Sequence, residues 1–521
     1  MKKSVEVKRN IVDRTIEYFA PVTGAKRFQA RGFMALAGGY TGARNDRRQT
    51  SEWNANTGDA NAALSGDLVS LRERSRDLVR NNPIARGAIN TVVTNVVGNG
   101  LRLNSQIDSD YLGLTEDAAR AWEAQAQRLF DIFSTECDLS EELNFGELQD
   151  LVFRSALESG DDFVIRRMLK QRVPGGLFRT RLQVVEADRV SNPNRKSDSA
   201  SLSGGVEIDP ATGRVLNYHV SDTHPGNVYK TSASWSAIPP KVAHERVILH
   251  MYQRLRPGQT RGEPYLAPVI ETLKQIDRYT EAELMAAVVS GMLSVFVKTE
   301  SAQGLAATEP TSETGSASSD KDFKLASGMI VDLAPGEDIE VMNPGRPNPA
   351  FDPFMTAILR QVGIALEIPF EVLTKHFTAS FSASRAALEM AWQFFSRRRQ
   401  WLAGRFCQPT YEWVISEAVA AGYLQAPGFF DNPLIRRAYL GAEWVGPARI
   451  SLNPMQDANS DEKYINIGVK TLKDVTVERT GGDWVRVTKQ RAAEMNTRRD
   501  LGLTVDPVEA DEPIEQKDAE E

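Results

Sequence analysis

Two helical segments, separated by a stretch that cannot build a core, constrain this fold more than any other feature of the sequence. They cover residues 264–291 and 346–369, and each carries an apolar stripe at three- and four-residue spacing. Between them, "SAQGLAATEPTSETGSASSDKD" (301–322) is a polar insert without the apolar residues that would offset the entropy of folding. Because strand-like runs flank the insert, the sequence predicts a helix, a small β excursion over 292–345 and a returning helix.

The two helices carry signals at their ends. Pro264 is expected to open the first helix, since proline fits the first helical turn. In the second helix Asp352 is a good N-cap, Pro353 a good first residue, and Pro369 ends the helix. The predicted apolar stripes are Leu266, Val269, Ile270, Leu273 and Ile276, then Met355, Ile358, Leu359, Val362 and Leu366.

Before residue 264 the periodicity changes from helical to strand-like. Helices are predicted over 67–98 (with a break at Asn82-Pro83), 116–134 and 145–161. Strands are predicted over 163–169, 181–187 and 246–252, with a hairpin over 204–220. The fold class is therefore α+β and mostly helical. Residues 1–66 are expected to be an extended arm, because 38–66 has almost no apolar period.

The segment "SFSASRAALEMAWQFFSRRRQW" (380–401) follows a polar loop, 370–381. Ser380 or Ser382 is expected to cap a long helix over 382–425, whose aromatic side chains we interpret as a packing face. Arg397, Arg398 and Arg399 are interpreted as its solvated flank, with phosphate contact as the alternative. Residues 426–500 are predicted to be helical, and the acidic tail 501–521 to be disordered.

The residues that usually carry chemistry form no recognisable site. His244 and His250 are six positions apart, which on neither a helix nor a strand brings both to one metal ion. Cys137 and Cys407 form neither a disulfide framework nor a metal knuckle. Phosphate-binding glycine loops and nucleophile elbows are missing from the sequence. We predict no catalytic residue, no metal and no cofactor.

Charge and hydropathy narrow the class further. A net charge of −7 argues against a protein that coats nucleic acid by charge alone, although the segment 486–499 carries five basic residues against Glu494. The acidic pair Asp161-Asp162, at a helix–strand junction, is expected to be capping or solvated. The longest nearly apolar run, 285–297, has 13 residues, short of the ~20 that span a bilayer. We expect a soluble intracellular protein without a signal peptide or membrane contact.

Several motifs, in this order, make the chain resemble the lambda-type portal proteins of tailed bacteriophages over about residues 30–500. The most distinctive are "GQTRGEP" (258–264) and "FSASRAALEMAWQFFSRRR" (381–399). The others are "RDLVRNNPIARGAI" (76–89), "SNPN" (191–194), "GVEIDPATGRVLNYHV" (205–220), "HPG" (224–226) and "WVGPARISLNP" (444–454).

The resemblance implies a ring, typically of twelve subunits, with an axial channel at one capsid vertex of the virion. Double-stranded DNA would be packaged and ejected through it without sequence recognition. Expected partners are the terminase large subunit, head-completion or tail connector proteins, and capsid and scaffold proteins, met in the host cytoplasm during assembly. By the same resemblance the protein is no enzyme.

The portal plan of wing, stem, clip and crown also suggests where each part lies. The wing would be 67–263, the stem 264–291 and 346–369, the clip 292–345 and the crown 426–500. The loop 370–381 would be the tunnel loop, since a polar loop between rigid helices suits contact residues. Its candidates for approaching DNA are Lys375, His376, Phe377, Thr378 and Ser380.

Two other classes remain open on sequence alone. An intracellular enzyme with an unrecognised site would have a small-molecule pocket and form a small closed oligomer. A minor capsid or scaffold protein would assemble without a channel. The helix, β excursion and returning helix favour the portal class over both.

Overall fold

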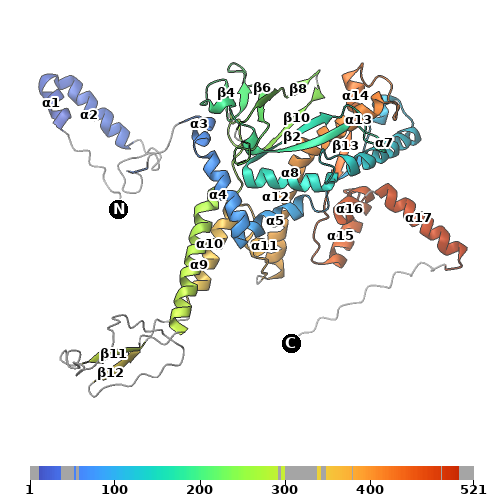
Figure 1. Cartoon of the computed structure of the whole chain (residues 1–521). Helices are drawn as coiled ribbons and strands as arrows, with labels where there is room; N and C mark the ends of the chain where they lie inside the picture. The colour runs from blue at the N-terminus through green and yellow to red at the C-terminus, as the bar shows by residue number, and fades with distance from the viewer. Residues whose placement is uncertain are drawn as a thin grey trace, which may run out of the picture. The chain divides into compact units, whose positions relative to one another are not determined.

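The computed structural model describes residues 11–36, 52–53, 58–230, 232–243, 245–291, 295–299, 337–341, 348–377, 380–482 and 484–503 (Figure 1). The chain divides into two units, residues 1–59 and 60–521. The first contains helices α1 (Ile11–Phe19) and α2 (Pro21–Leu36), so the expectation of an extended arm over 1–66 is wrong for these residues. The reason is local: α1 is amphipathic in sequence, and Pro21 is well placed to open α2.

The second unit begins with a further helix inside the predicted arm, α3 (Ala60–Ser65). Asn61 anchors it, since its side chain accepts hydrogen bonds from the Thr260 N–H and hydroxyl, both at 2.9 Å. Helices α4 (Leu68–Asn81) and α5 (Pro83–Val96) follow, which confirms the predicted break. Asn82 caps α5 by accepting from the Ala85 N–H at 2.8 Å, and it donates to Asp277 at 2.6 Å.

The predicted hairpin and strands form a β block, and three helices precede it in the chain. The helices are α6 (Ser109–Leu112), α7 (Glu116–Glu136) and α8 (Phe145–Ser159). One antiparallel sheet has the order β10 (Ile248–Tyr252), β2 (Asp161–Met168), β3 (Thr180–Glu186). A second has the order β4 (Leu202–Ser203), β5 (Val206–Ile208), β6 (Val215–Ser221), β7 (Trp235–Ile238). Strands β8 (Lys241–Val242) and β9 (Glu245–Arg246) pair separately.

Alternate residues of β2 serve two different cores. Phe163 and Ile165 lie in a small core that also contains Val206 and Tyr218 of the second sheet. Val164, pointing the other way, lies in the main core of the unit, and α8 packs against β2 and β10 (Figure 1). A strand covered on both faces cannot slip by one residue without exchanging its two cores, so its register is strongly specified.

The main core joins distant parts of the chain. Strand β13 (Ala442–Val445) pairs with β1 (Arg102–Ser105), and Trp444 lies 5.6 Å from the Phe130 ring and 6.2 Å from the Phe145 ring. Phe145 in turn stacks on Phe406 at 5.3 Å. The boundary predicted at residue 426 is therefore not a break in packing, because residues up to 445 share the core of 67–263.

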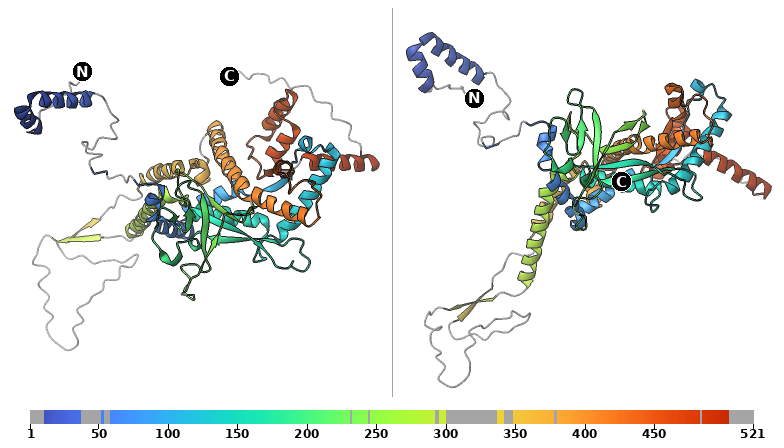
Figure 2. Two further views of the ribbon diagram at one scale, coloured as in Figure 1. Left: turned by 90° about the horizontal axis from the view of Figure 1, so that it is seen from above. Right: turned by 45° about the horizontal axis from the view of Figure 1, so that its top comes forward.

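The helix, β excursion and returning helix are present. They are α9 (Ile270–Gly291), the antiparallel pair β11 (Val295–Thr299) and β12 (Glu337–Val341), and α10 (Phe351–Ala365). Helices α9 and α10 pack together, and the β pair lies beyond the C-terminal end of α9 (Figure 2). The insert 301–322 lies outside the described residues.

Two predicted helix ends are wrong. Pro264 does not open α9, because a 3-10 turn at Ala267–Val269 comes first. Asp352 does not cap α10: Ala350 is the N-cap, so the Asp352 carboxylate lies in the first turn, where it still suits the helix dipole. The apolar stripes are confirmed, since Leu273, Ile276, Val362 and Leu366 are buried in the main core.

The predicted long helix is interrupted by a π-helical turn. It consists of α12 (Phe381–Leu402), the π turn Ala403–Cys407 and α13 (Gln408–Ala420), which ends before the predicted 425. In the π turn the Gln408 N–H donates to the Ala403 carbonyl, five residues back. Pro409 explains it, since proline clashes with the carbonyl four residues earlier in a regular α-helix.

The C-terminal part is mostly helical, as predicted, although strand β13 lies within it. Its helices are α14 (Pro433–Tyr439), α15 (Pro454–Asn466), α16 (Leu472–Thr480) and α17 (Trp484–Asp500). The acidic tail beyond residue 503 lies outside the described residues. Among the described helices, none combines the length and apolar character needed to cross a bilayer.

Candidate functional site

The segment between α10 and α12 is anchored rather than free. Residues Phe370–Thr374 form a short helix, α11, which corrects the expectation of a loop over all of 370–381. Val372 and Leu373 are the cause, because both are buried in the main core. Lys375 ends the turn in a left-handed conformation (φ 55°), and the His376 N–H donates to the Glu371 carbonyl at 3.1 Å.

The candidate DNA-contact residues of this segment differ in their surroundings. Lys375, His376 and Phe377 are consecutive and exposed. Thr378 lies outside the described residues. Ser380 is exposed, but its hydroxyl accepts from the Ala383 N–H at 3.4 Å and so caps α12. Three side chains are therefore presented outward from a backbone that is held on its N-terminal side by buried residues.

A cavity of about 390 Å³ opens beside Lys375 and Phe377. Leu388, Trp392 and Phe395 of α12 line it, so part of the predicted packing face borders a cavity within the subunit. Two ion pairs cross its rim, Arg385 with Asp457 at 3.4 Å and Arg449 with Glu389. These pairs connect α12 to the segment around α15.

The three consecutive arginines have three different roles. Arg397 is exposed and donates to both carboxylate oxygens of Glu367, at 2.8 and 3.0 Å. Arg398 is buried, with its guanidinium carbon 5.4 Å from the Tyr265 ring and 5.1 Å from the Phe394 ring. Arg399 donates to the carbonyls of Asn95 (2.9 Å) and Val96 (3.3 Å) at the end of α5.

The solvated flank predicted for 397–399 is therefore correct for Arg397 alone. Burial lowers the pKa of Arg399 to about 10, and it also lowers the pKa of Arg398. Helical geometry is the reason: three consecutive residues are 100° apart, so they face three directions. In the subunit, the phosphate-facing alternative does not fit the placement of Arg398 and Arg399 against their own chain.

A buried charge cluster, which sequence reasoning missed, lies where α8 meets β2. Asp161 is fully buried and accepts from Arg72 at 2.7 Å, from Arg261 at 2.5 and 3.0 Å, and from His250 at 3.1 Å. Burial alone would raise the pKa of Asp161, but the charges of Arg261 and Arg72 hold it well below the usual range. Burial lowers the pKa of His250 to about 4, against the effect of Asp161.

Arg261, from the "GQTRGEP" motif, organises the surrounding backbone. It also donates to the carbonyls of Ala187 and Val190, both at 2.7 Å, and to that of Gly204. One side chain thereby links β2, the turn after β3 and the loop before β5. The expectation that Asp161-Asp162 is capping or solvated is wrong, because both carboxyl groups are completely buried.

Asp162 points away from this cluster. Among the described residues neither of its carboxyl oxygens has a hydrogen-bond partner of normal geometry, and burial raises its pKa well above the usual range, against a weaker opposing effect of the Phe163 backbone N–H. A raised pKa means that the folded state prefers the protonated form. The stability contributed by that protonation is complete below the unfolded pKa of about 3.9 and is lost as pH rises through the folded pKa.

Replacing Asp162 by Asn should therefore stabilise the chain at neutral to alkaline pH, by about 1–2 kcal/mol. The gain should shrink towards pH 4, where the native carboxyl group is already neutral. Urea unfolding between pH 4 and 9 measures this, with the exposed Asp110→Asn as control. An equal effect of Asp162→Asn at every pH would contradict the buried, protonated carboxyl group.

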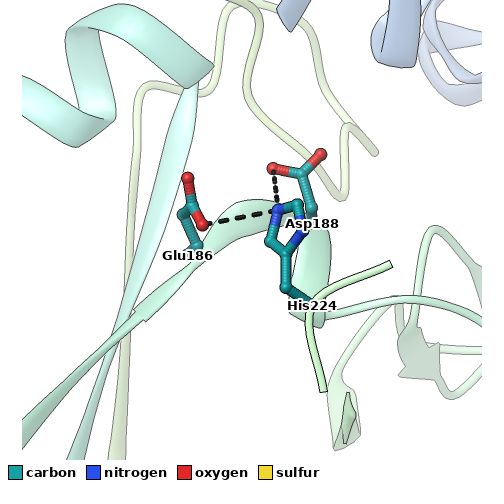
Figure 3. A group of neighbouring side chains, drawn as sticks. All are labelled: Glu186, Asp188 and His224. Atoms are coloured by element: carbon teal, nitrogen blue, oxygen red, sulfur yellow. Dashed lines mark ion pairs between the residues drawn. The ribbon is translucent and has the colours of Figure 1, made fainter. Parts of the chain in front are cut away.

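Glu186, Asp188 and His224 form a second cluster, at the edge of the β block (Figure 3). His224 Nε2 lies 3.4 Å from Glu186 Oε2 and 3.8 Å from Asp188 Oδ2. Arg76 of α4 already binds Asp188 and lies 3.5 Å from Glu186. Burial would raise the pKa of Asp188, yet Arg76 holds it below the usual value. Because Arg76 supplies the positive charge, we assign no metal to this cluster.

Comparison with known proteins shows similarity to one family. The family model "Phage portal protein, lambda family" matches residues 46–399. The portal protein of Escherichia phage N15 is 25% identical over 495 residues, covering 91% of each chain. Portal protein B of Escherichia phage lambda is 25% identical over 479 residues, covering 87% of this chain and 89% of its own. A probable portal protein of Halomonas phage phiHAP-1 is 23% identical, covering 88% and 86%.

Among solved structures, the chain is similar to a chain in the neck of a native gene transfer agent particle. The two are 15% identical with a TM-score of 0.44, and the match covers 79% of this chain and 92% of the other. A chain of the virion of a native gene transfer agent particle matches with a TM-score of 0.43 at the same identity.

Proposed function

The chain belongs to the lambda family of phage portal proteins, and we propose that Lys375, His376 and Phe377 contact DNA inside the portal ring. As a portal protein it is a structural component of the virion, at the capsid vertex through which DNA is packaged and ejected, rather than an enzyme. The family builds an oligomeric ring. Family membership thus removes the enzyme class and the channel-free capsid class left open by sequence.

The exposed triplet is the observation that carries the DNA-contact proposal. Lys375, His376 and Phe377 follow a helix whose Val372 and Leu373 are buried, so the backbone that presents them is held in place. One lysine per subunit, repeated around a ring, gives many weak phosphate contacts without reading bases. Such contacts position DNA and still allow it to move. Thr378, next in the chain, belongs to the same proposal.

We also propose that α9 and α10 line the channel of a twelve-subunit ring. Twelve helices packed side by side at ~9 Å close into a ring roughly 34 Å across between axes. Subtracting a helix diameter of ~10 Å leaves about 25 Å, which admits a duplex. By the same arithmetic ten subunits would leave only about 19 Å, which is too narrow for a duplex. Negative-stain imaging with native mass measurement counts the subunits directly.

The partners follow from this arrangement as proposals. The β11–β12 excursion, at the far end of the α9–α10 pair, is the surface we assign to the terminase large subunit. Head-completion or tail connector proteins would dock at the same ring after packaging. Capsid and scaffold proteins would meet the subunit surfaces that remain outside the ring contacts.

The DNA-contact proposal predicts a strong packaging defect for Lys375→Glu. A ring of added negative charges should repel phosphates in the channel and lower the amount of packaged DNA roughly tenfold. DNA recovered per particle after nuclease treatment measures the effect, with ring formation checked by negative-stain microscopy. Lys170→Glu, an exposed lysine after β2, is the matched control. Normal packaging by Lys375→Glu rings would overturn the contact proposal and leave family membership untouched.

A further inference from the structure

Arg398 differs from the other buried arginines of the described residues. The others are Arg72, Arg181 and Arg261. Arg72 and Arg261 donate to Asp161. Arg181 donates to the carbonyls of Phe178 and Thr180 and lies 3.3 Å from Glu136. Within the described residues Arg398 differs from these three in donating to no acceptor at all; its Nε is buried without a partner, as is the Nε of Arg181.

The Arg398 side chain is nevertheless held in a defined position. Its guanidinium lies against the rings of Tyr265 and Phe394, which are themselves stacked 6.3 Å apart. The Tyr265 hydroxyl donates to the Leu366 carbonyl, which fixes that ring. The nearby Glu367 carboxylate is taken by Arg397 at 2.8 Å. A positioned guanidinium without an acceptor is a preorganised half of an ion pair, and leaving it buried and unpaired is costly.

The space in front of Arg398 is large and positively charged. It is a cavity of about 610 Å³, where the turn before α9, the end of α10 and the end of α12 meet. Four arginines line it, against only two carboxylates: Arg254, Arg397, Arg398 and Arg405, with Glu263 and Glu367. We call it the Arg398 cavity. An anionic group would complete both the hydrogen bonds of Arg398 and the charge balance of its walls.

We propose that the Arg398 cavity is an oxyanion site that takes a carboxylate side chain of the neighbouring subunit in the ring. The inference rests on the ring assembly of the proposed function, because it needs a second copy. A guanidinium binds a carboxylate through two parallel hydrogen bonds, and the aromatic walls keep its fork in one plane. The phosphates of a duplex lie on a stiff rod, whereas a glutamate or aspartate side chain is slender enough to enter a cavity and reach a 9% exposed Arg398.

Removing the guanidinium should affect the stability of the single subunit and the stability of the ring in opposite directions. In Arg398→Met the monomer should be at least as stable as the native monomer, since a buried unpaired charge is replaced by an apolar side chain of similar length. The ring should weaken, with the concentration for half-assembly rising at least about tenfold, because a carboxylate at the interface loses its partner. Arg398→Lys keeps the charge but not the forked guanidinium, so its rings should be weaker than native rings and stronger than those of Arg398→Met.

The experiment compares these variants with Arg120→Met, an exposed arginine of α7, in the full chain. Native mass spectrometry over a concentration series measures assembly, and thermal unfolding at low concentration measures the monomer. A stable monomer with weakened rings supports the proposal, and cryo-electron microscopy of native rings should place a carboxylate within hydrogen-bond distance of Arg398. Normal assembly of Arg398→Met overturns the proposal. If DNA retention is impaired while assembly is normal, the ligand of Arg398 is a phosphate group and not a carboxylate. Native chain that forms no rings would instead contradict the ring premise, and the inference with it.

Discussion

Replacing Arg261 by methionine should lower the free energy of unfolding by about 3–5 kcal/mol, the range for breaking a buried ion pair. The change removes the two hydrogen bonds that Asp161 accepts from Arg261 and leaves this carboxylate with Arg72, His250 and the Gly262 N–H. It also removes a donor from the carbonyls of Ala187, Val190 and Gly204, of which the Ala187 carbonyl still accepts from the Val190 N–H at 3.2 Å. Each buried acceptor left without a donor adds its own desolvation cost.

Urea unfolding followed by circular dichroism measures this loss, with Arg214→Met as the matched control. Arg214 lies in the exposed turn between β5 and β6, in the same β block. Its replacement should change the free energy of unfolding by less than about 0.5 kcal/mol. Equal stability of Arg261→Met and Arg214→Met would show that the Asp161 cluster does not hold the β block together.

Features set by neighbouring residues could be predicted from the sequence. The break at Asn82-Pro83 was readable because asparagine caps a helix and proline fits its first turn. The hairpin over 204–220 was readable because Asp209 and Gly213 close its turn: the Asp209 carboxylate accepts from the Ala211 N–H at 3.0 Å. The stripes of α9 and α10 follow from helical spacing alone. Each of these signals lies within a few residues of the feature that it determines.

The Asp161 cluster could not be predicted, because its members come from positions far apart in the chain. Arg72, Asp161 and Arg261 are separated by about a hundred residues at each step, as their hydrogen bonds record. The sequence did single out both "GQTRGEP" and Asp161-Asp162, but nothing local indicates that one motif binds the other. A charged residue is ordinarily exposed, so the local expectation for Asp161 was the wrong one.

The segment 370–381 shows the same limit of sequence-based prediction. Its polar composition predicted exposure, which holds for Lys375, His376 and Phe377. Composition could not show that Val372 and Leu373 would find space in the main core, since that depends on the shape of α5 and α12 around them. The same holds for Arg397, Arg398 and Arg399. Their type and spacing predicted one shared role, but consecutive residues of a helix face different directions, so each has different surroundings.

Gly262→Ala should be a strongly destabilising change, although it adds only one methyl group, because two backbones meet there. A Cβ at Gly262 would lie 1.9 Å from the Gly160 carbonyl oxygen, and a Cβ at Gly160 would lie 2.5 Å from the Glu263 carbonyl carbon. Gly160, at the end of α8, also has a φ of 88°, which side-chain-bearing residues rarely adopt. No rotamer change relieves a contact between a Cβ and a backbone oxygen, so we expect a loss of about 3 kcal/mol or more.

This loss would also reach the Asp161 cluster. Gly262 donates its N–H to Asp161 at 3.2 Å and follows Arg261, so moving its backbone displaces both partners of the buried ion pair. The control is Gly87→Ala in α5, where an added Cβ meets nothing within 4 Å, and which should stabilise its helix by up to about 1 kcal/mol. Urea midpoints of the two variants should therefore move in opposite directions. If Gly262→Ala unfolds at the native midpoint, close packing of the two backbones does not explain why residues 160 and 262 are both glycine.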